Sequence, residues 1–444
     1  MDRKALIVFA RYPEPGKVKT RLASTLGAEA ACDLYEMLLR YTLGVVHDFS
    51  RRCPETAVFV AVSPEERLEA FRRRFGVPWP IVPQKGDHLG RRMAEAFADL
   101  FHRGYGAVVL VGSDIFDLSP NDLGDAFRIL ESRNAVLGPA RDGGFYAIGL
   151  HPPCPRIFET PSWGTADVFH RTRTSLERLG RSVALLPVRT DIDRPEDLSS
   201  LDRHWAFSNP VSVIVPTTAP RAALRPWVET LQRLLWPQDT VCVVHGSPSP
   251  PLTEGERENG LLWVESALGR GLQMNAGVRA SPGRILWFLH DDCVPNFAAA
   301  YRVRTIARDE RFALGCFRLA FSPTNRALNA IAAWANLRTR LFRLPYGDQG
   351  LFCRRHTFHA VGGFRRPYLM EDVDFVRSCR RLGRLLVVPD VLSTSPRRYL
   401  AEGLLRTSLR NHATLFAHFL GVSNAVLYRR YYGTAAQRRD RQGS

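Results

Sequence analysis

Short apolar runs rich in β-branched residues alternate with helical patterns along the first half of the chain. The runs ALIVF (5–9), TAVFVAV (56–62) and AVVLVGS (107–113) are bounded by turn residues and predict buried strands. Between them, residues 31–48 and 91–104 place apolar side chains at helical spacing. Strands separated by helices predict an α/β unit with a mainly parallel sheet and helices on both of its faces.

The pattern breaks at residues 197–210, and VSVIVP (211–216) begins it again as a fresh buried strand. A helix at 224–235, a strand at 240–245 and a strand at 284–292 that runs into carboxylates then repeat the same plan. The sequence therefore predicts two tandem α/β domains and a helical segment near the C-terminus. The predicted boundaries are 1–205, 206–432 and a basic tail at 433–444.

Positive charge is concentrated in the second half. The net charge is +17, and residues 1–205 carry 28 basic and 27 acidic side chains, which leaves 61 − 28 = 33 basic and 44 − 27 = 17 acidic for the remainder. Such a field attracts phosphates, anionic lipid headgroups or nucleic acid. The excess of positive charge equally fits a general preference of this sequence for arginine. Nothing beyond charge supports nucleic acid, so none is expected.

The cysteines and the apolar stretches bear on the compartment. Eight scattered cysteines show no C-x-x-C pair and no metal-type spacing with histidine, which favours reduced thiols and a cytoplasmic location. The N-terminus has no long apolar segment of the signal-peptide kind. Residues 412–428 are too polar for a membrane span, and two alternatives stay open for them. They form a packed helix pair, or they lie on the inner face of an anionic membrane as a peripheral contact.

The loops that follow the predicted strands of the first domain carry candidate phosphate ligands. FARYPEPGKVKTRL (9–22) follows the first strand and holds Lys17, Lys19 and Arg21, two of them among only four lysines in the chain. Backbone N–H groups and cations of such a loop can hold phosphate oxygens. Asp114 follows the third strand and Asp142 lies in a later Gly-rich turn, where a carboxylate could hold Mg²⁺ or Mn²⁺. Helix capping and tight turns are the structural alternatives for both.

Long motifs in residues 4–201 give the first domain a family resemblance. FARYPEPGKVKTRLASTLG, LGRRMAEAF, VVLVGSD, LGPARDGGFYAIGL, SWGTADV and DIDRPEDL resemble a bacterial family of GT-A-like transferases found in radical-SAM and arsenosugar contexts. It is related at the fold level to the phospholactate and molybdenum-cofactor guanylyltransferases. The resemblance implies a metal at Asp114 and phosphates near Lys17, Lys19, Arg21 and Asp142. Ile115-Phe116 departs from the usual Cys-Pro.

The second domain places acidic residues at a strand end and at a helix start. RILWFLHDD ends in His290, Asp291 and Asp292, while MEDVDF opens a helical pattern with Glu371 and Asp372. Carboxylates near a positively charged region suggest a divalent ion that offsets a diphosphate. The helix dipole alone is a structural alternative for the acidic helix start.

Residues 211–432 resemble a family 2 inverting glycosyltransferase through QMNAG, FLHDD, YGDQG, VGGF and MEDVDF. The resemblance implies a metal at Asp292, with His290 and Asp291 beside it, and Asp372 as the general base, with Glu371 next to it. It implies donor contacts from Arg270, Gln273 and Asn275, and acceptor contacts from Asp348 and Gln349. The usual Asn-Glu after the first strand is missing, His245 stands where an aspartate is usual, and Arg-Arg-Trp is Arg397-Arg398-Tyr399.

Together these features predict a metal-dependent enzyme whose second domain transfers a sugar from a nucleotide-diphosphate donor to a small or lipid-like acceptor. The first domain is then a second transferase or a unit that prepares the donor. One alternative makes it a nucleotidyltransferase that acts on a phosphorylated metabolite with a nucleoside triphosphate. Another makes one domain a silent nucleotide-binding scaffold, which the missing Asn-Glu and His245 would explain.

Overall fold

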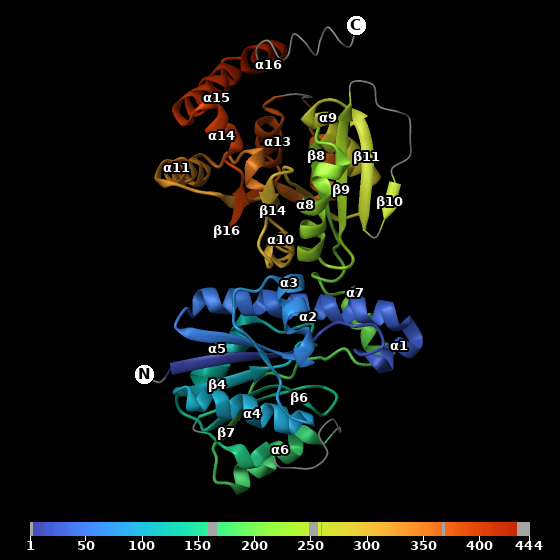
Figure 1. The fold of residues 1–444 in the computed structure, drawn as a ribbon, viewed down its shortest axis with the longest axis vertical. Coiled ribbons are helices and arrows are strands. Elements are labelled where there is room, and N and C mark those ends of the chain that lie inside the picture. The colour runs from blue at the N-terminus through green and yellow to red at the C-terminus, as the bar shows by residue number, and fades with distance from the viewer. Residues whose placement is uncertain are drawn as a thin grey trace. The chain divides into compact units, whose positions relative to one another are not determined.

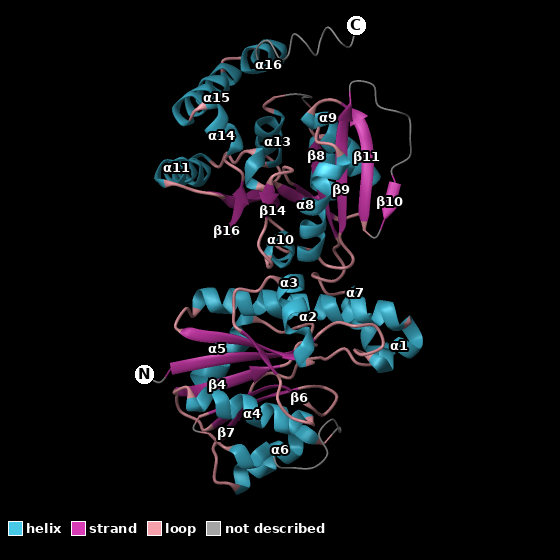
Figure 2. Ribbon diagram, in the orientation of Figure 1, coloured by secondary structure: helices cyan, strands magenta, loops and turns pink. Residues whose placement is uncertain are grey.

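The computed structural model describes residues 3–151, 153–158, 167–247, 256–258, 260–365 and 369–432. The chain divides into two compact units, Met1–Ser208 and Asn209–Ser444. The predicted basic tail and most of the SWGTADV motif (162–168) lie outside the described residues. Each unit is an α/β structure (Figures 1 and 2).

Unit 1 is built on a seven-stranded sheet in the order β3-β2-β1-β4-β6-β5-β7. Neighbouring strands are parallel except where β6 pairs with β4 and with β5. The strands are β1 (Arg3–Arg11), β2 (Thr56–Ser63), β3 (Ile81–Pro83), β4 (Tyr105–Val111), β5 (Ala135–Pro139), β6 (Phe145–Leu150) and β7 (Val183–Leu185). The apolar side chains of β1, β2 and β4 are almost fully buried, which confirms the strands predicted from ALIVF, TAVFVAV and AVVLV.

Helices cover both faces of this sheet, as the alternating pattern predicts. Figure 1 shows α2 along one face and α4 and α6 on the other. The helices are α1 (Thr20–Leu26), α2 (Ala28–Arg52), α3 (Leu68–Phe75), α4 (Leu89–His102), α5 (Pro120–Ile129), α6 (Val168–Arg178) and α7 (Leu198–Asp202). Ser119 caps α5 in a capping box with Asp122, and Pro120 follows at the first helical position.

Unit 2 contains a nine-stranded mixed sheet in the order β10-β11-β9-β8-β12-β15-β14-β16-β13. The central β11, β9, β8 and β12 run parallel, whereas β15 is antiparallel to both of its neighbours. The strands are β8 (Val211–Thr217), β9 (Thr240–Ser247), β10 (Glu256–Glu258), β11 (Leu261–Ala267), β12 (Ile285–Phe288), β13 (Cys293–Val294), β14 (Phe312–Phe321), β15 (Phe352–Arg354) and β16 (Arg384–Thr394). The fold class is therefore confirmed for both units.

The helices of unit 2 include a separate C-terminal group, which the sequence predicts as a helical segment. They are α8 (Arg221–Leu234), α9 (Arg270–Ala280), α10 (Ala299–Ala307), α11 (Arg326–Phe342), α12 (Arg355–Val361), α13 (Glu371–Cys379), α14 (Arg397–Glu402), α15 (Leu404–Phe419) and α16 (Asn424–Tyr432). Within the described ranges, no helix combines the length and apolar character that crossing a membrane requires.

One predicted strand is shorter in the structure. The sequence predicts a strand over 284–292, but β12 ends at Phe288. The chain then turns, and the Cys293 N–H donates to the His290 carbonyl at 3.2 Å. Polar His290, Asp291 and Asp292 are thereby released from the buried sheet into a loop, because continued strand would bury their side chains without partners.

Candidate functional site

Unit 1 has a cavity of about 520 Å³ at the carboxyl ends of β1 and β4. This is the edge where open α/β sheets bind ligands. The candidate residues predicted for this unit all line it: Lys17, Lys19, Arg21, Asp114 and Asp142. The structure thus brings together loops that are more than a hundred residues apart in sequence.

Lys19 is the most constrained of these side chains. It lies in the left-handed region (φ 45°) immediately before α1, and its side chain is only 5% exposed. Its Nζ lies 3.1 Å from Asp114 Oδ2 and 3.7 Å from Asp193 Oδ1. Burial alone lowers the pKa of Lys19, but the two carboxylates outweigh it, so the pKa is raised. Lys19 is therefore a fixed cation that holds two loops together.

Asp114 is held by the same contact but remains open to the cavity. Burial favours its neutral form, yet the Lys19 ammonium outweighs burial and lowers the pKa of Asp114. About two fifths of the side chain, 43%, is exposed. The carboxylate is thus ionised and accessible. Ile115 stands where the resembled family usually has cysteine. Its side chain is buried, and its backbone forms an isolated antiparallel β-bridge with Asp191.

Asp191 is a site residue that the sequence reasoning did not assign. Burial raises its pKa to about 6, and the Asp142 and Asp114 carboxylates add to the rise. Asp193, two residues later, accepts from Arg21 Nη1 at 2.7 Å and so neutralises that cation. The signal was present in DIDRPEDL, since two aspartates one residue apart in an extended chain point the same way.

Lys17 and Asp142, the other two candidates, differ in whether their side chains are already engaged within the fold. Lys17 is exposed on the rim of the cavity. Asp142 accepts a hydrogen bond from the Gly144 N–H at 2.8 Å. This is the contact expected if Asp142 serves to form a tight turn. Lys17 can thus reach an anionic ligand, while Asp142 mainly shapes the turn and adds negative charge beside Asp191.

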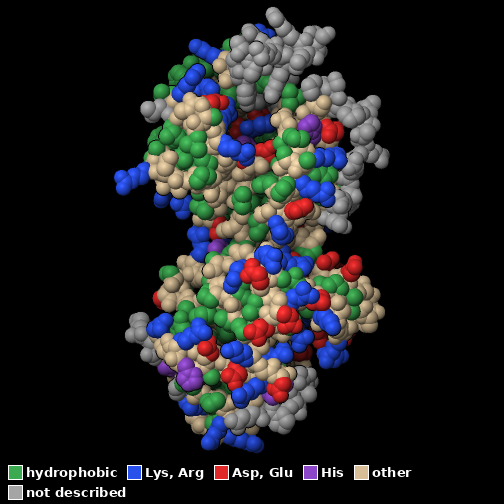
Figure 3. Space-filling model, viewed as in Figure 1, with side chains coloured by type: hydrophobic (Ala, Val, Ile, Leu, Met, Phe, Trp, Pro, Cys, Tyr) green, Lys and Arg blue, Asp and Glu red, His purple; other side chains and the backbone are tan. Residues whose placement is uncertain are grey.

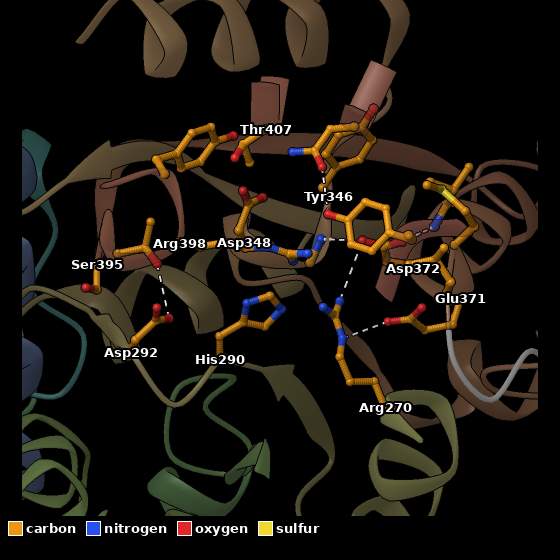
Figure 4. A pocket seen from close by; sticks show the side chains of 18 of the residues that line it. Arg270, His290, Asp292, Tyr346, Asp348, Glu371, Asp372, Ser395, Arg398 and Thr407 are labelled. Atoms are coloured by element: carbon orange, nitrogen blue, oxygen red, sulfur yellow. Dashed lines mark hydrogen bonds and ion pairs between the residues drawn. The ribbon is translucent and has the colours of Figure 1, made fainter. Parts of the chain in front are cut away.

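In unit 2, four chain segments converge on one region. Arg270 begins α9, His290 to Asp292 form the loop after β12, Asp348 lies in the 3₁₀ turn Gly347–Gln349, and Glu371 and Asp372 open α13. Figure 4 shows Arg270 pointing between His290 and the two acidic residues of α13. The acidic first turn of α13 is favoured by the helix dipole, but its side chains also line a cavity.

Two cavities adjoin here and share Arg270, His290 and Asp292 as a common wall. The first, about 360 Å³, extends from these residues to Thr217, Gly269 and Asp291. The second, about 200 Å³, extends to Asp348, Asp372 and the C-terminal helices. A ligand that spans the common wall would thus meet a cation, a neutral imidazole and a carboxylate at its centre.

Arg270 links the acidic residues of α13. Its Nε lies 2.8 Å from Glu371 Oε1 and its Nη2 lies 3.9 Å from Asp372 Oδ2. Burial raises the pKa of Glu371 to about 7, and Arg270 limits the rise. Asp372 Oδ2 also accepts from the Gly347 N–H at 2.8 Å. Each carboxylate oxygen can accept more than one hydrogen bond, so Asp372 keeps capacity toward the cavity.

The remaining polar groups around the common wall have few partners. Burial, with Arg270 nearby, lowers the pKa of His290 to about 3, so its ring is neutral at physiological pH. Burial raises the pKa of Asp348 to about 6, and its buried Oδ1 has no hydrogen-bond partner among the described residues. Asp292 Oδ1 accepts from Thr394 Oγ1 at 3.1 Å, and burial, with the neighbouring Asp291 carboxylate, raises the pKa of Asp292.

This donor set fits a hard divalent cation only in part. Carboxylate oxygens are the ligands that Mg²⁺ and Mn²⁺ prefer, and the open Asp292 carboxylate supplies one. Asp291, by contrast, accepts from Thr217 Oγ1 at 2.6 Å. Across the described ranges there is no group of three or more His, Cys, Asp and Glu side chains that could hold an ion alone. Oxygens from a bound phosphate ligand would have to complete the coordination.

Three predicted contact residues use their amides within the fold. Gln273 lines the larger cavity but its Nε2 donates to the carbonyls of Thr217 and Val244. Both amide atoms of Asn275 bond the backbone of Phe364. Gln349 is fully buried and bonds Thr339 and the Phe317 carbonyl. These amide groups position strand ends and loops, and Gln273 also faces the larger cavity.

The smaller cavity is completed by residues that sequence reasoning did not assign. Arg398 and Tyr399 of α14, Thr407 and Asn411 of α15 and Tyr431 of α16 line its outer side. The guanidinium of Arg338 lies 3.5 Å from the ring centroid of Tyr346, which also lines this cavity. Only Arg397-Arg398-Tyr399 carried a recognisable signal. His245, which stands where an aspartate is usual, contacts Glu265, with His245 Nδ1 3.0 Å from Glu265 Oε2.

Comparisons with known proteins add the family context. The bacterial family DUF2064, described as uncharacterised proteins conserved in bacteria, matches residues 49–165. A crystal structure from Desulfovibrio desulfuricans G20, titled "putative nucleotide-diphospho-sugar transferase", is 30% identical and covers 52% of this chain and 98% of that chain, with a TM-score of 0.42. No curated protein matches the chain in sequence.

Two further solved structures are more distant. The mannosyltransferase PcManGT from Pyrobaculum calidifontis, solved with GDP-Man and Mn²⁺, is 17% identical and covers 50% of this chain and 69% of that chain, with a TM-score of 0.36. Glucosyl-3-phosphoglycerate synthase from Mycobacterium tuberculosis, solved with Mn²⁺ and UDP, is 13% identical and covers 46% and 78%, with a TM-score of 0.30. The sequence identity and the coverage of the Desulfovibrio protein show the relationship: the chain belongs to the same family as that protein.

Proposed function

We propose that unit 2 transfers a glycosyl group from a nucleotide-diphosphate sugar to a hydroxyl acceptor. The observation that carries the proposal is the pair of adjoining cavities with a common wall of Arg270, His290 and Asp292. The donor nucleotide occupies the larger cavity and the acceptor occupies the smaller one. The reacting bond then lies at the wall, between the diphosphate and Asp372.

The chemistry follows from the groups on each side of this wall. Asp372 accepts the proton of the acceptor hydroxyl while that oxygen forms its bond to the anomeric carbon. The bond from this carbon to the diphosphate oxygen breaks on the opposite face, and the electron pair leaves with the diphosphate. Arg270, held by Glu371, stabilises the negative charge that develops there. Mg²⁺ or Mn²⁺ held by Asp292 and the donor phosphates would supply further charge neutralisation.

Mass spectrometry of the products formed from a pool of nucleotide sugars and hydroxyl acceptors tests the proposal. Asp372→Asn should reduce turnover by about 10²- to 10⁴-fold and leave donor affinity unchanged. Asp374→Asn is the matched control, because Asp374 lies on the same helix but its Oδ1 contacts His418 Nε2 at 3.0 Å. Donor binding without turnover, unaffected by Asp372→Asn, would favour the scaffold alternative.

Unit 1 has its own candidate function. Its cavity combines Lys17, an exposed cation on the rim, with the accessible carboxylate Asp114, which suits a nucleoside triphosphate. We propose nucleotidyl transfer to a phosphorylated metabolite, which would release pyrophosphate. Asp114→Ala should abolish pyrophosphate release alone, whereas Asp292→Ala should abolish sugar transfer alone. Loss of both activities in either variant would contradict independent sites.

A further inference from the structure

The C-terminal helices of unit 2 expose an unusual amount of apolar surface. On α15, one stripe contains Leu409, Phe416 and Phe419 and continues into Leu420, and three of these side chains are about two thirds exposed (70% for Leu409, 66% for Phe416 and 69% for Leu420). On α11, Trp334, Leu337, Leu341 and Phe342 are also exposed. Figure 3 shows hydrophobic side chains, with basic side chains among them, gathered on this part of unit 2; the basic ones are all arginine, because unit 2 contains no lysine.

The two stripes form one continuous face. Trp334 Nε1 of α11 donates to His412 Nε2 of α15 at 3.0 Å. Beside this contact lies a groove of about 390 Å³ whose lining is mainly apolar and includes Phe342 and Phe419. We call the exposed side chains of α11 and α15 together with this groove the apolar face. Large apolar surfaces of this kind mark interaction sites rather than ordinary solvent-facing helices.

Charge identifies what the apolar face fits. Residues 321–347 contain four arginines and no acidic residue, and residues 397–432 contain six arginines and one glutamate. Arg377 lies 5.3 Å from the Phe419 ring centroid, and Arg380 Nη1 donates to the Phe342 carbonyl at 3.0 Å, so cations border the groove. Apolar stripes bordered by arginine match the depth profile of an anionic bilayer, with acyl chains below and headgroup phosphates above.

Other occupants fit less well. The residues after Tyr432, GTAAQRRDRQGS, contain no large apolar side chain and add net positive charge, so they cannot supply an apolar cover. A second copy of the same face would bring arginines against arginines, because α11, α15 and α16 carry no acidic residue. An anionic partner satisfies both the apolar side chains and the cations.

We infer that the apolar face docks the protein on an anionic phospholipid membrane. The outer side of α15 meets the bilayer, whereas Thr407 and Asn411 on its inner side line the cavity proposed for the acceptor. The helix therefore stands between the membrane and the site, and the acceptor is a hydroxyl compound carried by the membrane. This last step rests on the proposed function, while the docking itself does not.

Sedimentation of the full chain with phosphatidylcholine vesicles, with and without phosphatidylglycerol, tests the docking. The chain should bind the phosphatidylglycerol vesicles, bind phosphatidylcholine alone much more weakly, and be released by high salt. Leu409→Glu/Phe416→Glu should weaken binding by about a hundredfold, roughly tenfold for each buried apolar side chain lost. Both positions are exposed, so the fold should be retained.

The matched control is Leu185→Glu/Val188→Glu, which adds the same charge at exposed apolar positions of unit 1 and should leave vesicle binding unchanged. Equal binding to both kinds of vesicle, no binding, or wild-type binding by Leu409→Glu/Phe416→Glu would overturn the inference. So would a wild-type dimer in light scattering that the same variant converts to a monomer, since a second copy would then cover the face.

A parallel titration separates this inference from the proposed function. Calorimetry with a nucleoside diphosphate and Mn²⁺ should give the same affinity for the wild type and for Leu409→Glu/Phe416→Glu. If the wild type binds anionic vesicles but no nucleotide, the proposed transferase site is wrong and the docking stands. If it binds nucleotide but no vesicle, the docking is wrong and the transferase site stands.

Discussion

Replacing Lys19 with methionine should destabilise unit 1 even in the absence of any ligand. The side chain is 5% exposed and its ammonium contacts the Asp114 and Asp193 carboxylates. Removing one partner of a buried ion pair costs about 3–5 kcal/mol, because the other charge is left uncompensated. Asp114 keeps access to solvent and Asp193 keeps Arg21, so we expect about 2 kcal/mol.

Hydrogen exchange of peptides from β1 and β4 measures this free energy, since it reports the opening of unit 1 separately from unit 2. Arg21→Met is the matched control, because its side chain is largely exposed and an exposed ion pair contributes at most about 1 kcal/mol. Lys19→Met/Asp114→Asn should recover about half of the loss by removing the unpaired carboxylate. If Lys19→Met is as stable as Arg21→Met and only nucleotide binding is weakened, Lys19 is a simple phosphate ligand and not a structural cation.

Two further predictions concern titrating carboxylates. Asp191→Asn should raise the unfolding free energy of unit 1 by about 1 kcal/mol at about pH 8. Burial and the Asp142 and Asp114 carboxylates raise the pKa of Asp191 from 3.8 to about 6. The ionised carboxylate therefore destabilises unit 1 above about pH 6, and the amide removes this cost. This gain in unfolding free energy should vanish as the pH falls through about 4, and a gain that hydrogen exchange still detects below pH 4 would contradict the prediction. Glu371 has a pKa of about 7 and pairs with Arg270 only when it is ionised. We therefore expect kcat/KM of sugar transfer to decrease as the pH falls below about 7. Glu371→Gln should flatten that limb at a lower maximum, and an unchanged limb would exclude Glu371 as its origin.

The sequence was most informative where chemistry follows directly from strand ends. Asp114 follows a buried strand, His290 to Asp292 follow another, and Asp372 opens a helix, so local pattern and elementary topology were enough to place them near cavities. The same logic located the edge of each sheet that carries a candidate site. The end of β12 lies four residues earlier than predicted, and the ends of α2 and β4 also differ from the prediction by a few residues.

The sequence was least informative where a side chain's partner is far away along the chain. Asn275 bonds the backbone of Phe364, 89 positions later, and nothing local to either residue signals that contact. Lys19 shows the same limit, because its orientation toward Asp114 is set by the packing of two loops. Tyr431 reaches the smaller cavity only because α16 folds back over the unit, which helical periodicity cannot predict.

The most direct test of the transferase proposal is the effect of Mn²⁺ on the affinity of the chain for a nucleoside diphosphate. Calorimetry would use Asp114→Ala as the reference protein, so that the cavity of unit 1 does not contribute. We expect Mn²⁺ to increase nucleoside diphosphate affinity by at least about tenfold in this protein, and the increase to disappear when Asp292→Asn is added. An equal increase with and without Asp292→Asn, or no nucleotide binding by Asp114→Ala at all, would contradict a metal-assisted donor site in unit 2.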